Sequence, residues 1–135
     1  MRIAEIADQS LKAVGRSGAA ITVAFVRDAV IRRLNRDYRG RDISTDVLSF
    51  PAGEDVPAGL AQAGLGAPEP SRYLGDVVIS ADTAVSQAQA SRFSFEREVS
   101  ELVIHGVLHL CGYDHETDRG EMNRMELKLR RKLLE

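Results

Sequence analysis

The chain has 135 residues, a formal net charge of −2, 44% hydrophobic residues, 5% aromatic residues and no tryptophan. This length suits one domain with a mainly aliphatic core, and the charge excludes the overall basic character of many nucleic-acid-binding proteins, though not a local basic patch. The single cysteine excludes an internal disulfide, and no apolar run resembles a signal peptide or a membrane span. We therefore expect a cytoplasmic protein without a membrane partner.

The first third of the chain predicts two helices and two strands. Apolar residues recur at helical spacing over residues 2–14, and the β-branched run at 21–26 predicts a strand. An apolar residue at every fourth position of 27–40 predicts a second helix that ends at Gly40. Residues 45–51, which end in a proline, predict a second strand.

The rest of the chain begins with a segment of different composition. All four prolines lie within residues 51–73, which predicts a long irregular loop. A third strand is predicted at 74–80, a short helix at 81–90, and a longer helix from a cap at Ser94 to a stop at Gly112. A last helix follows a D-x-x-E capping pattern that starts at Asp118. These elements predict one α+β domain over residues 1–135.

All three histidines of the chain lie in one stretch of eleven residues, "HGVLHLCGYDH" (105–115). His105 and His109 are four positions apart, so on a helix their imidazoles project from the same face and can share an ion about 2.0–2.1 Å from each nitrogen. Gly112 allows a sharp bend that brings His115 to the same ion. Three neutral histidines leave the fourth position of a tetrahedral zinc to water, whose pKa can fall to about 7, so the spacing predicts one catalytic Zn²⁺ per chain. Three imidazoles also suit nickel.

Two neighbouring residues limit this interpretation. Cys111 lies about 200° around the helix from His109, so we expect a small buried apolar side chain and not a fourth ligand. The spacing is similar to the metzincin peptidase pattern H-E-x-x-H-x-x-G-x-x-H, but Gly106 stands where those enzymes have their general-base glutamate. We expect this glycine to leave room for a bulky group beside the metal.

Three segments resemble one known family, the bacterial YbeY endoribonucleases. "LNRDYRGRDISTDVLSFP" (34–51) resembles the family's LN-x-x-YR-x-x-D-x-x-TDVLSFP signature, "LGDVVIS" (74–80) resembles its LGD-I/V-x-I strand, and 105–115 resembles its H-G-x-L-H-L-x-G-Y-D-H motif. The resemblance covers roughly residues 20 to 130. The chain departs from the family in starting almost at the first helix, where members usually have an extra strand, in Ser44 where proline is common, and in a long loop after Pro51.

The resemblance implies a zincin-like α+β domain in which a small mixed β-sheet packs against several helices and the H-x3-H helix carries the metal site. It implies a zinc-dependent, single-strand-specific endoribonuclease that matures the 3′ end of 16S rRNA and acts in late-stage 70S ribosome quality control. Its expected partners are an rRNA precursor and the ribosome, chiefly the small subunit. The family's zinc ligands correspond to His105, His109 and His115, and its functional arginine corresponds to Arg39.

Several charged residues have a second interpretation besides a structural one. Arg39, past the apolar stripe of its helix, can bind a phosphate bidentately and stabilise charge that develops in the transition state. It belongs to an arginine-rich segment (27–41) whose other members suit either a phosphate patch or a solvated helix face. Asp76 either caps a turn or holds the tautomer of a zinc-bound histidine, and Asp114 orients the turn, accepts a proton or holds a ligand.

The sequence leaves the general base unassigned, and it leaves open whether water or the RNA 2′-hydroxyl attacks the phosphodiester. Two other functions stay open at this point: a zincin-type metallopeptidase, and a non-catalytic ribosome-assembly or RNA-binding factor whose zinc only fixes the last helices. The sequence does not indicate the oligomeric state.

Overall fold

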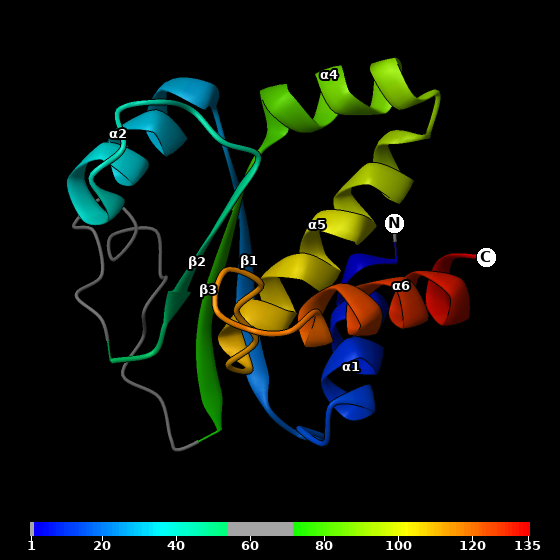
Figure 1. Ribbon diagram of the computed structural model, residues 1–135. Coiled ribbons are helices and arrows are strands. Elements are labelled where there is room, and N and C mark those ends of the chain that lie inside the picture. Colours follow the sequence, from blue (N-terminus) through cyan, green and yellow to red (C-terminus); the bar gives the residue numbers. More distant parts are fainter. Residues whose placement is uncertain (1, 54–71) are drawn as a thin grey trace.

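The computed structural model describes residues 2–53 and 72–135. Most of the loop predicted at 51–73 lies outside these residues. The described elements follow one another as α1 (Ile3–Ala13), β1 (Ala20–Val26), α2 (Asp28–Arg39), β2 (Val47–Pro51), β3 (Tyr73–Ser80), α4 (Ala81–Ser91), α5 (Phe95–Leu110) and α6 (Glu121–Leu134), as Figure 1 shows. Every helix and strand expected from the sequence is present. Among the described helices, none combines the length and apolar character that a membrane crossing requires.

The three strands form one mixed sheet in the order β1-β3-β2. β3 is the central strand, and it pairs with β1 in parallel and with β2 antiparallel, so that Val77 lies between Val23 and Ser49. All residues of β3 from Gly75 to Ser80 are buried. A central strand covered on both faces is expected to be an almost continuous apolar run, which is what "VVIS" provides.

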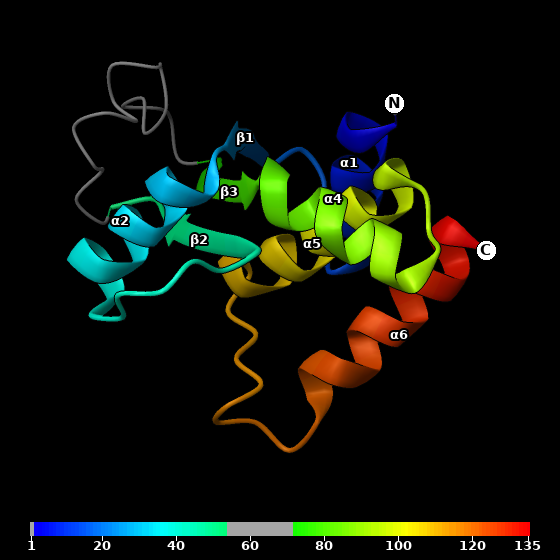
Figure 2. The same ribbon diagram turned by 90° about the horizontal axis from the view of Figure 1, so that it is seen from above.

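Alternate residues of β3 contribute to two separate cores. Val77 and Ile79 pack in the larger core with α1, α5 and α6, whereas Val78 packs on the opposite face with α2 and Phe50. Figure 2 shows α2 and α5 on opposite sides of the strands. The sheet is therefore a middle layer, and helix α5, which carries His105 and His109, lies on one of its faces.

Helix α5 is the centre of the larger core. Its residues Val99, Val103, Ile104, Val107 and Leu108 are fully buried. The predicted cap is confirmed, because the Ser94 hydroxyl accepts from the backbone N–H of Arg97 at 3.0 Å. The helix ends at Leu110, and Gly112 follows with φ +94°, a left-handed conformation that only glycine adopts readily.

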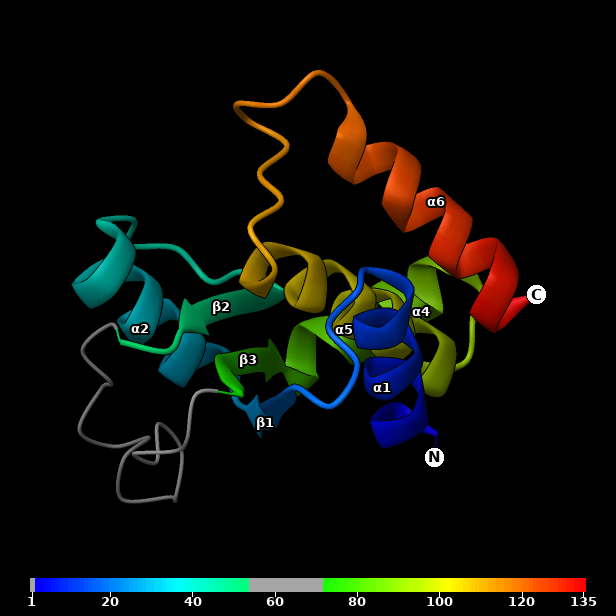
Figure 3. The same ribbon diagram turned by 90° about the horizontal axis from the view of Figure 1, so that it is seen from below.

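The chain then runs through an extended connection, seen clearly in Figure 3, before α6 returns alongside α5. The expected capping box at the start of α6 is not formed as predicted. Asp118 accepts the backbone N–H groups of Gly120 and Met122, and Glu121 reaches the N–H of Arg119 and not that of Asp118. The aspartate lies outside the helix because α6 begins only at Glu121.

Candidate metal centre

The three histidines converge at the end of α5. His105 and His109 project side by side, with their Nε2 atoms 3.1 Å apart, and His115 reaches them from the connection that follows Gly112. One ligand nitrogen from each histidine lies within 4.8 Å of the other two. The predicted return of the chain after Gly112, which brings the third imidazole to the first two, is therefore confirmed.

The arrangement fits a tetrahedral metal ion. Two nitrogens bound to one zinc at about 2.0–2.1 Å with a tetrahedral angle lie roughly 3.3 Å apart. The separation of 3.1 Å between the Nε2 atoms of His105 and His109 is close to that value. His115 is exposed, so its ring can adjust toward the half-buried His105 and His109 with little steric resistance. Three imidazoles are a donor set that zinc and neighbouring transition metals accept.

Glu126, on α6, fixes the orientation of His105. Its Oε1 lies 2.6 Å from Nδ1 of His105, so a proton on Nδ1 leaves the Nε2 lone pair directed at the shared position. This role of Glu126 was not predicted from the sequence. A signal was present, because Glu126 lies between Met122 and Leu129 on the apolar stripe of α6, where a charged side chain needs a partner.

The directions of the pKa shifts favour a neutral His109 and an ionised Glu126. Burial, and then the neighbouring rings of His105 and His115, lower the pKa of His109, which favours the neutral form that a metal requires. Burial acts to raise the pKa of Glu126, but the hydrogen bond and charge of His105 and the charge of Arg130 outweigh it, and the net pKa is lowered.

The histidines open into a cleft of about 660 Å³. Its walls come from the end of α2, the segment through β2, the end of α5 and the following turn, and the residues that line it are Asn35, Arg39, Arg41, Ile43, Thr45, Val47, Leu48, Ser49, Pro51, His105, His109, Gly112, Tyr113, Asp114, His115 and Glu116. The cleft brings Arg39 together with all three histidines, although more than sixty positions separate them in the sequence.

Contacts from β2 hold Arg39 at the cleft. Its Nη2 donates to the carbonyl oxygen of Ser49 at 2.8 Å, and its guanidinium carbon lies 4.7 Å from the centre of the Phe50 ring. A cation over an aromatic face is attracted to it. The end of α2 and strand β2 thus fix the position of one positive charge on the wall of the cleft.

The structure places Asp76 away from the cleft wall. It is a buried residue of β3, and its carboxylate accepts a hydrogen bond from the Tyr73 hydroxyl, which also contacts Thr22. The Nδ1 partner of His105 is Glu126. A role of Asp76 beside a zinc ligand stays a prediction without a direct contact to support it.

Asp114 shapes the turn that carries His115. Its carboxylate accepts the backbone N–H of Glu116 at 3.0 Å, and its carbonyl accepts those of Thr117 and Asp118. These bonds hold the backbone on both sides of His115. Asp114 also lines the cleft, so the other roles proposed for it stay compatible with its position.

The expectation that Gly106 leaves room beside the metal is wrong. Gly106 faces β3, and a Cβ at this position would lie 2.6 Å and 2.9 Å from the two γ-carbons of Val77. The missing side chain therefore serves close packing of α5 on the sheet. A glutamate at position 106 would collide with β3 before it reached the metal position. This position therefore cannot supply the general base of a zincin-type peptidase. Cys111, as expected, is not part of the histidine group.

The other arginines of residues 27–41 are mostly in ion pairs on the surface. Arg27 pairs with Asp82, Arg32 with Asp42 and Arg36 with Asp37. These six side chains are all more than a third exposed, so the pairs favour a solvated helix face for this part of the segment.

Comparison with known proteins agrees with these observations. The family model of endoribonuclease YbeY matches residues 1–135. Relatives named endoribonuclease YbeY include those of Anaeromyxobacter sp. (44% identical, covering 90% of this chain and 58% of the relative), Aquifex aeolicus (43%, covering 85% and 69%) and Geobacter metallireducens (39%, covering 96% and 81%). The chain thus spans less than two thirds of the Anaeromyxobacter protein.

The fold is similar to a solved structure as well. The solution structure of TM1509 from Thermotoga maritima is 30% identical, with a TM-score of 0.59 over 95% of this chain and 76% of that protein. The match of the family model over the whole chain, with the converging histidines, identifies the chain as a member of the endoribonuclease YbeY family.

Proposed function

We propose that this protein is a zinc-dependent endoribonuclease that cleaves single-stranded RNA, with one Zn²⁺ per chain held by His105, His109 and His115. The observation that carries the proposal is the convergence of three imidazole nitrogens, within 4.8 Å of one another, in the same cleft as Arg39. The name of the relatives, endoribonuclease YbeY, supports RNA as the substrate.

The chain's own residues divide the chemistry among them. A zinc ion in such a site supplies Lewis acidity, which activates water and polarises a phosphoryl oxygen. His105, His109 and His115 would hold the ion, and all three line the cleft that the substrate would enter. Arg39 holds its positive charge against the scissile phosphate and complements the charge that develops in the transition state. The carbonyl of Ser49 and the ring of Phe50 keep this guanidinium oriented before the substrate arrives.

The finer assignment follows the family resemblance. The proposed substrate is the 3′ end of the 16S rRNA precursor, with the ribosome and chiefly its small subunit as partner, and the proposed role includes late-stage 70S quality control in the cytoplasm. We propose that residues 1–135 act as one domain, since the two cores share β3. Asp76 and Asp114 are proposed to support the site from outside the ligand set.

The test combines metal analysis with RNA cleavage. The purified protein should carry one zinc per chain and cut a single-stranded RNA within its length but leave a duplex of the same sequence intact. Removal of zinc by a chelator should stop cleavage, and zinc should restore it. His109→Ala should lose metal and cleavage together. Analysis of the product ends decides the attacking group, because a 2′,3′-cyclic phosphate excludes direct attack by water.

Two outcomes would replace the proposal. If the protein degrades unstructured polypeptides in a His109-dependent way and leaves RNA intact, it is a peptidase. If it binds ribosomes and zinc but cuts RNA in no metal state, it is a non-catalytic assembly factor. Full metal content in both His105→Ala and His109→Ala would contradict the ligand assignment itself.

A further inference from the structure

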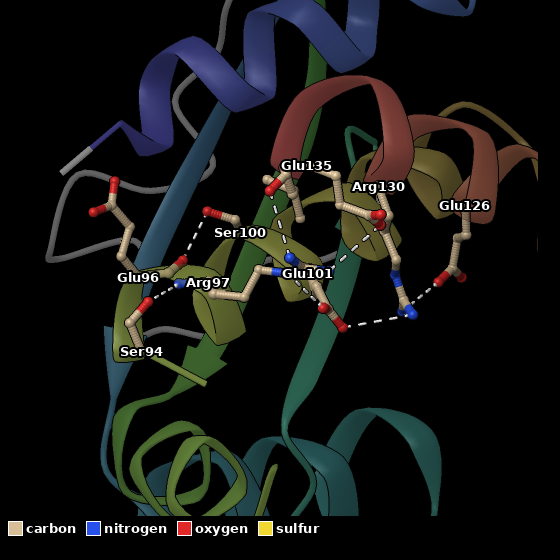
Figure 4. A network of polar contacts seen from close by, with 9 residues as sticks. Ser94, Glu96, Arg97, Ser100, Glu101, Glu126, Arg130 and Glu135 are labelled. Carbon is tan, nitrogen blue, oxygen red and sulfur yellow. Dashed lines mark hydrogen bonds and ion pairs between the residues drawn. The ribbon is translucent and has the colours of Figure 1, made fainter. Parts of the chain in front are cut away.

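A row of alternating charges leads from the metal centre toward the end of the chain. Figure 4 shows Glu126 and Arg130 of α6 and Glu101 and Arg97 of α5 in contact with one another. Nη2 of Arg130 lies 3.0 Å from Glu126 and Nη1 lies 3.5 Å from Glu101, whose other oxygen is 2.8 Å from Nε of Arg97. We call these four residues the α5–α6 charge row.

The first member of the row touches a metal ligand. One carboxylate oxygen of Glu126 contacts Nδ1 of His105 at 2.6 Å, and the other contacts Arg130. Both oxygens are thus engaged, on opposite sides, which leaves the carboxylate a single orientation. The side chain of Glu126 is only 12% exposed, so water competes little for these contacts.

The charge row is also less exposed than the ion pairs that the arginines around α2 form. Its members range from 12% to 32% exposed, whereas the arginine pairs around α2 have both side chains 36% exposed or more. Charge pairs that are partly removed from water are screened less and hold their geometry better than exposed ones. The row therefore joins α5 and α6 beside His105 with contacts that can determine a side-chain position.

We propose that Glu126 is a positioning residue for the metal centre and that Arg130, held by Glu101, acts through it. Glu126 accepts the Nδ1 proton of His105, which selects the tautomer with a free Nε2 lone pair and directs this lone pair at the ion. Arg130 keeps the carboxylate in the orientation that the hydrogen bond needs. This inference rests on the proposed metal site, but its first step concerns the metal-free protein.

The chemistry of metal-bound histidine gives the expected size. A carboxylate on the second ring nitrogen raises the basicity of the ligand and fixes the ring, and loss of such a partner typically lowers metal affinity by about 10–100-fold. Without a bound metal or a hydrogen-bond partner, a neutral histidine imidazole prefers to carry its proton on Nε2. The carboxylate of Glu126 reverses that preference at His105, so the ligand is already in the binding tautomer.

The experiment measures zinc affinity by competition with a chromophoric chelator, on the full chain, for Glu126→Ala, Glu126→Gln and Arg130→Gln. Arg131→Gln is the matched control, because Arg131 is the next residue of α6 and lies exposed on the outer face.

Zinc affinity should fall about 10–100-fold in Glu126→Ala and several-fold in Glu126→Gln, which keeps the size and one acceptor oxygen. It should fall several-fold in Arg130→Gln and stay unchanged in Arg131→Gln. Arg130→Gln should have no further effect in the Glu126→Gln background, because the two residues act in series.

A second measurement separates positioning from a general loss of stability. Nitrogen-15 NMR of the metal-free protein at alkaline pH reports which ring nitrogen of His105 carries the proton. It should be Nδ1 in the wild type and Arg131→Gln, and it should shift toward Nε2 in the Glu126 variants. Zinc affinity within twofold of wild type in Glu126→Ala, or an unchanged tautomer in both Glu126 variants, would overturn the inference. A wild type that binds no zinc would instead refute the proposed function, and the tautomer would still decide the role of Glu126.

Discussion

Arg39 donates a hydrogen bond to the carbonyl oxygen of Ser49, and the hydroxyl of the same serine donates to the carbonyl of Gly106 at 3.2 Å. One residue of β2 thus contacts both the arginine of the cleft and the helix that carries two of the histidines. This strand fixes the position of the positive charge relative to the histidines. A phosphate that enters the cleft therefore meets a charge and a metal site whose separation is set before binding.

Arg39→Ala should leave the metal in place and lower RNA cleavage by about 10²-fold or more, because it removes the charge proposed to stabilise the transition state and none of the proposed metal ligands. Zinc content and the rate of single-stranded RNA cleavage are the two measurements. Arg33→Ala is the control, since Arg33 is an exposed residue of the same helix that does not line the cleft. Equal activity of the two variants would mean that Arg39 has no special role.

Gly106→Ala should destabilise the protein by about 1–3 kcal/mol, because the added methyl group overpacks the contact between α5 and β3. The new Cβ would lie 2.6 Å from Cγ1 of Val77, a stiff β-branched side chain on the central strand. Denaturant unfolding gives the free energy.

The Val77→Ala background should remove most of this cost. With both γ-carbons of Val77 gone, the nearest remaining atom of that residue is its Cβ at 3.3 Å, and the helix preference of alanine over glycine, roughly 0.5–1 kcal/mol, acts in the opposite direction. If Gly106→Ala costs the same free energy in both backgrounds, contact with Val77 is not the reason for the glycine.

Gly106 and Val77 show how much of the site can be predicted from the sequence alone. The convergence of the histidines was predictable, because helical spacing and a glycine that permits a positive φ are local properties of residues 105–115. The role of Gly106 was not, since the neighbour that explains it, Val77, lies 29 positions away in another element. The sequence shows directly that position 106 lacks the glutamate of the metzincin peptidases, but the reason for the glycine is its packing against Val77 and not space beside the metal.

Glu126 shows a different kind of limit. Its place on the apolar stripe of α6 could have indicated a buried partner, but the identity of the partner depends on how α6 packs against α5. Helix and strand positions follow from periodicity, whereas the order β1-β3-β2 and the packing of α5 against α6 are long-range properties. For the same reason Arg39 could be singled out by its segment but placed in the cleft only by the structure.

Glu98→Gln should stabilise the protein at pH 8 and have little effect near pH 4. Glu98 is 8% exposed, and burial, then the charges of Glu101 and Asp46, raise the pKa of its carboxyl. A group whose pKa is raised in the folded state favours folding while it is protonated, and this advantage is lost as the pH rises through the folded-state pKa. At pH 8 the wild type carries an unfavourable buried charge that the amide lacks.

Thermal unfolding at the two pH values measures this difference. A gain of about 4 °C at pH 8, the shift that roughly 1 kcal/mol produces in a domain of this size, is the expected magnitude. Glu5→Gln, at an exposed position of α1, should show no comparable gain. A Glu98→Gln variant that is equally stabilised at pH 4 and pH 8 would show that the ionisation of Glu98 is irrelevant to stability.

Zinc should stabilise the wild type because a metal that binds only the folded state shifts the unfolding equilibrium. At a free zinc concentration about 100 times the dissociation constant, the gain is about 2.7 kcal/mol. The gain should disappear in His109→Ala, whose site keeps two ligands, one of them on the exposed connection after Gly112. Because His105 and His109 belong to the well-packed helix α5, the chelated wild type should stay folded and lose only this increment. Cooperative unfolding on chelation at 25 °C would instead assign the metal a structural role, as the site would then hold the last two helices together.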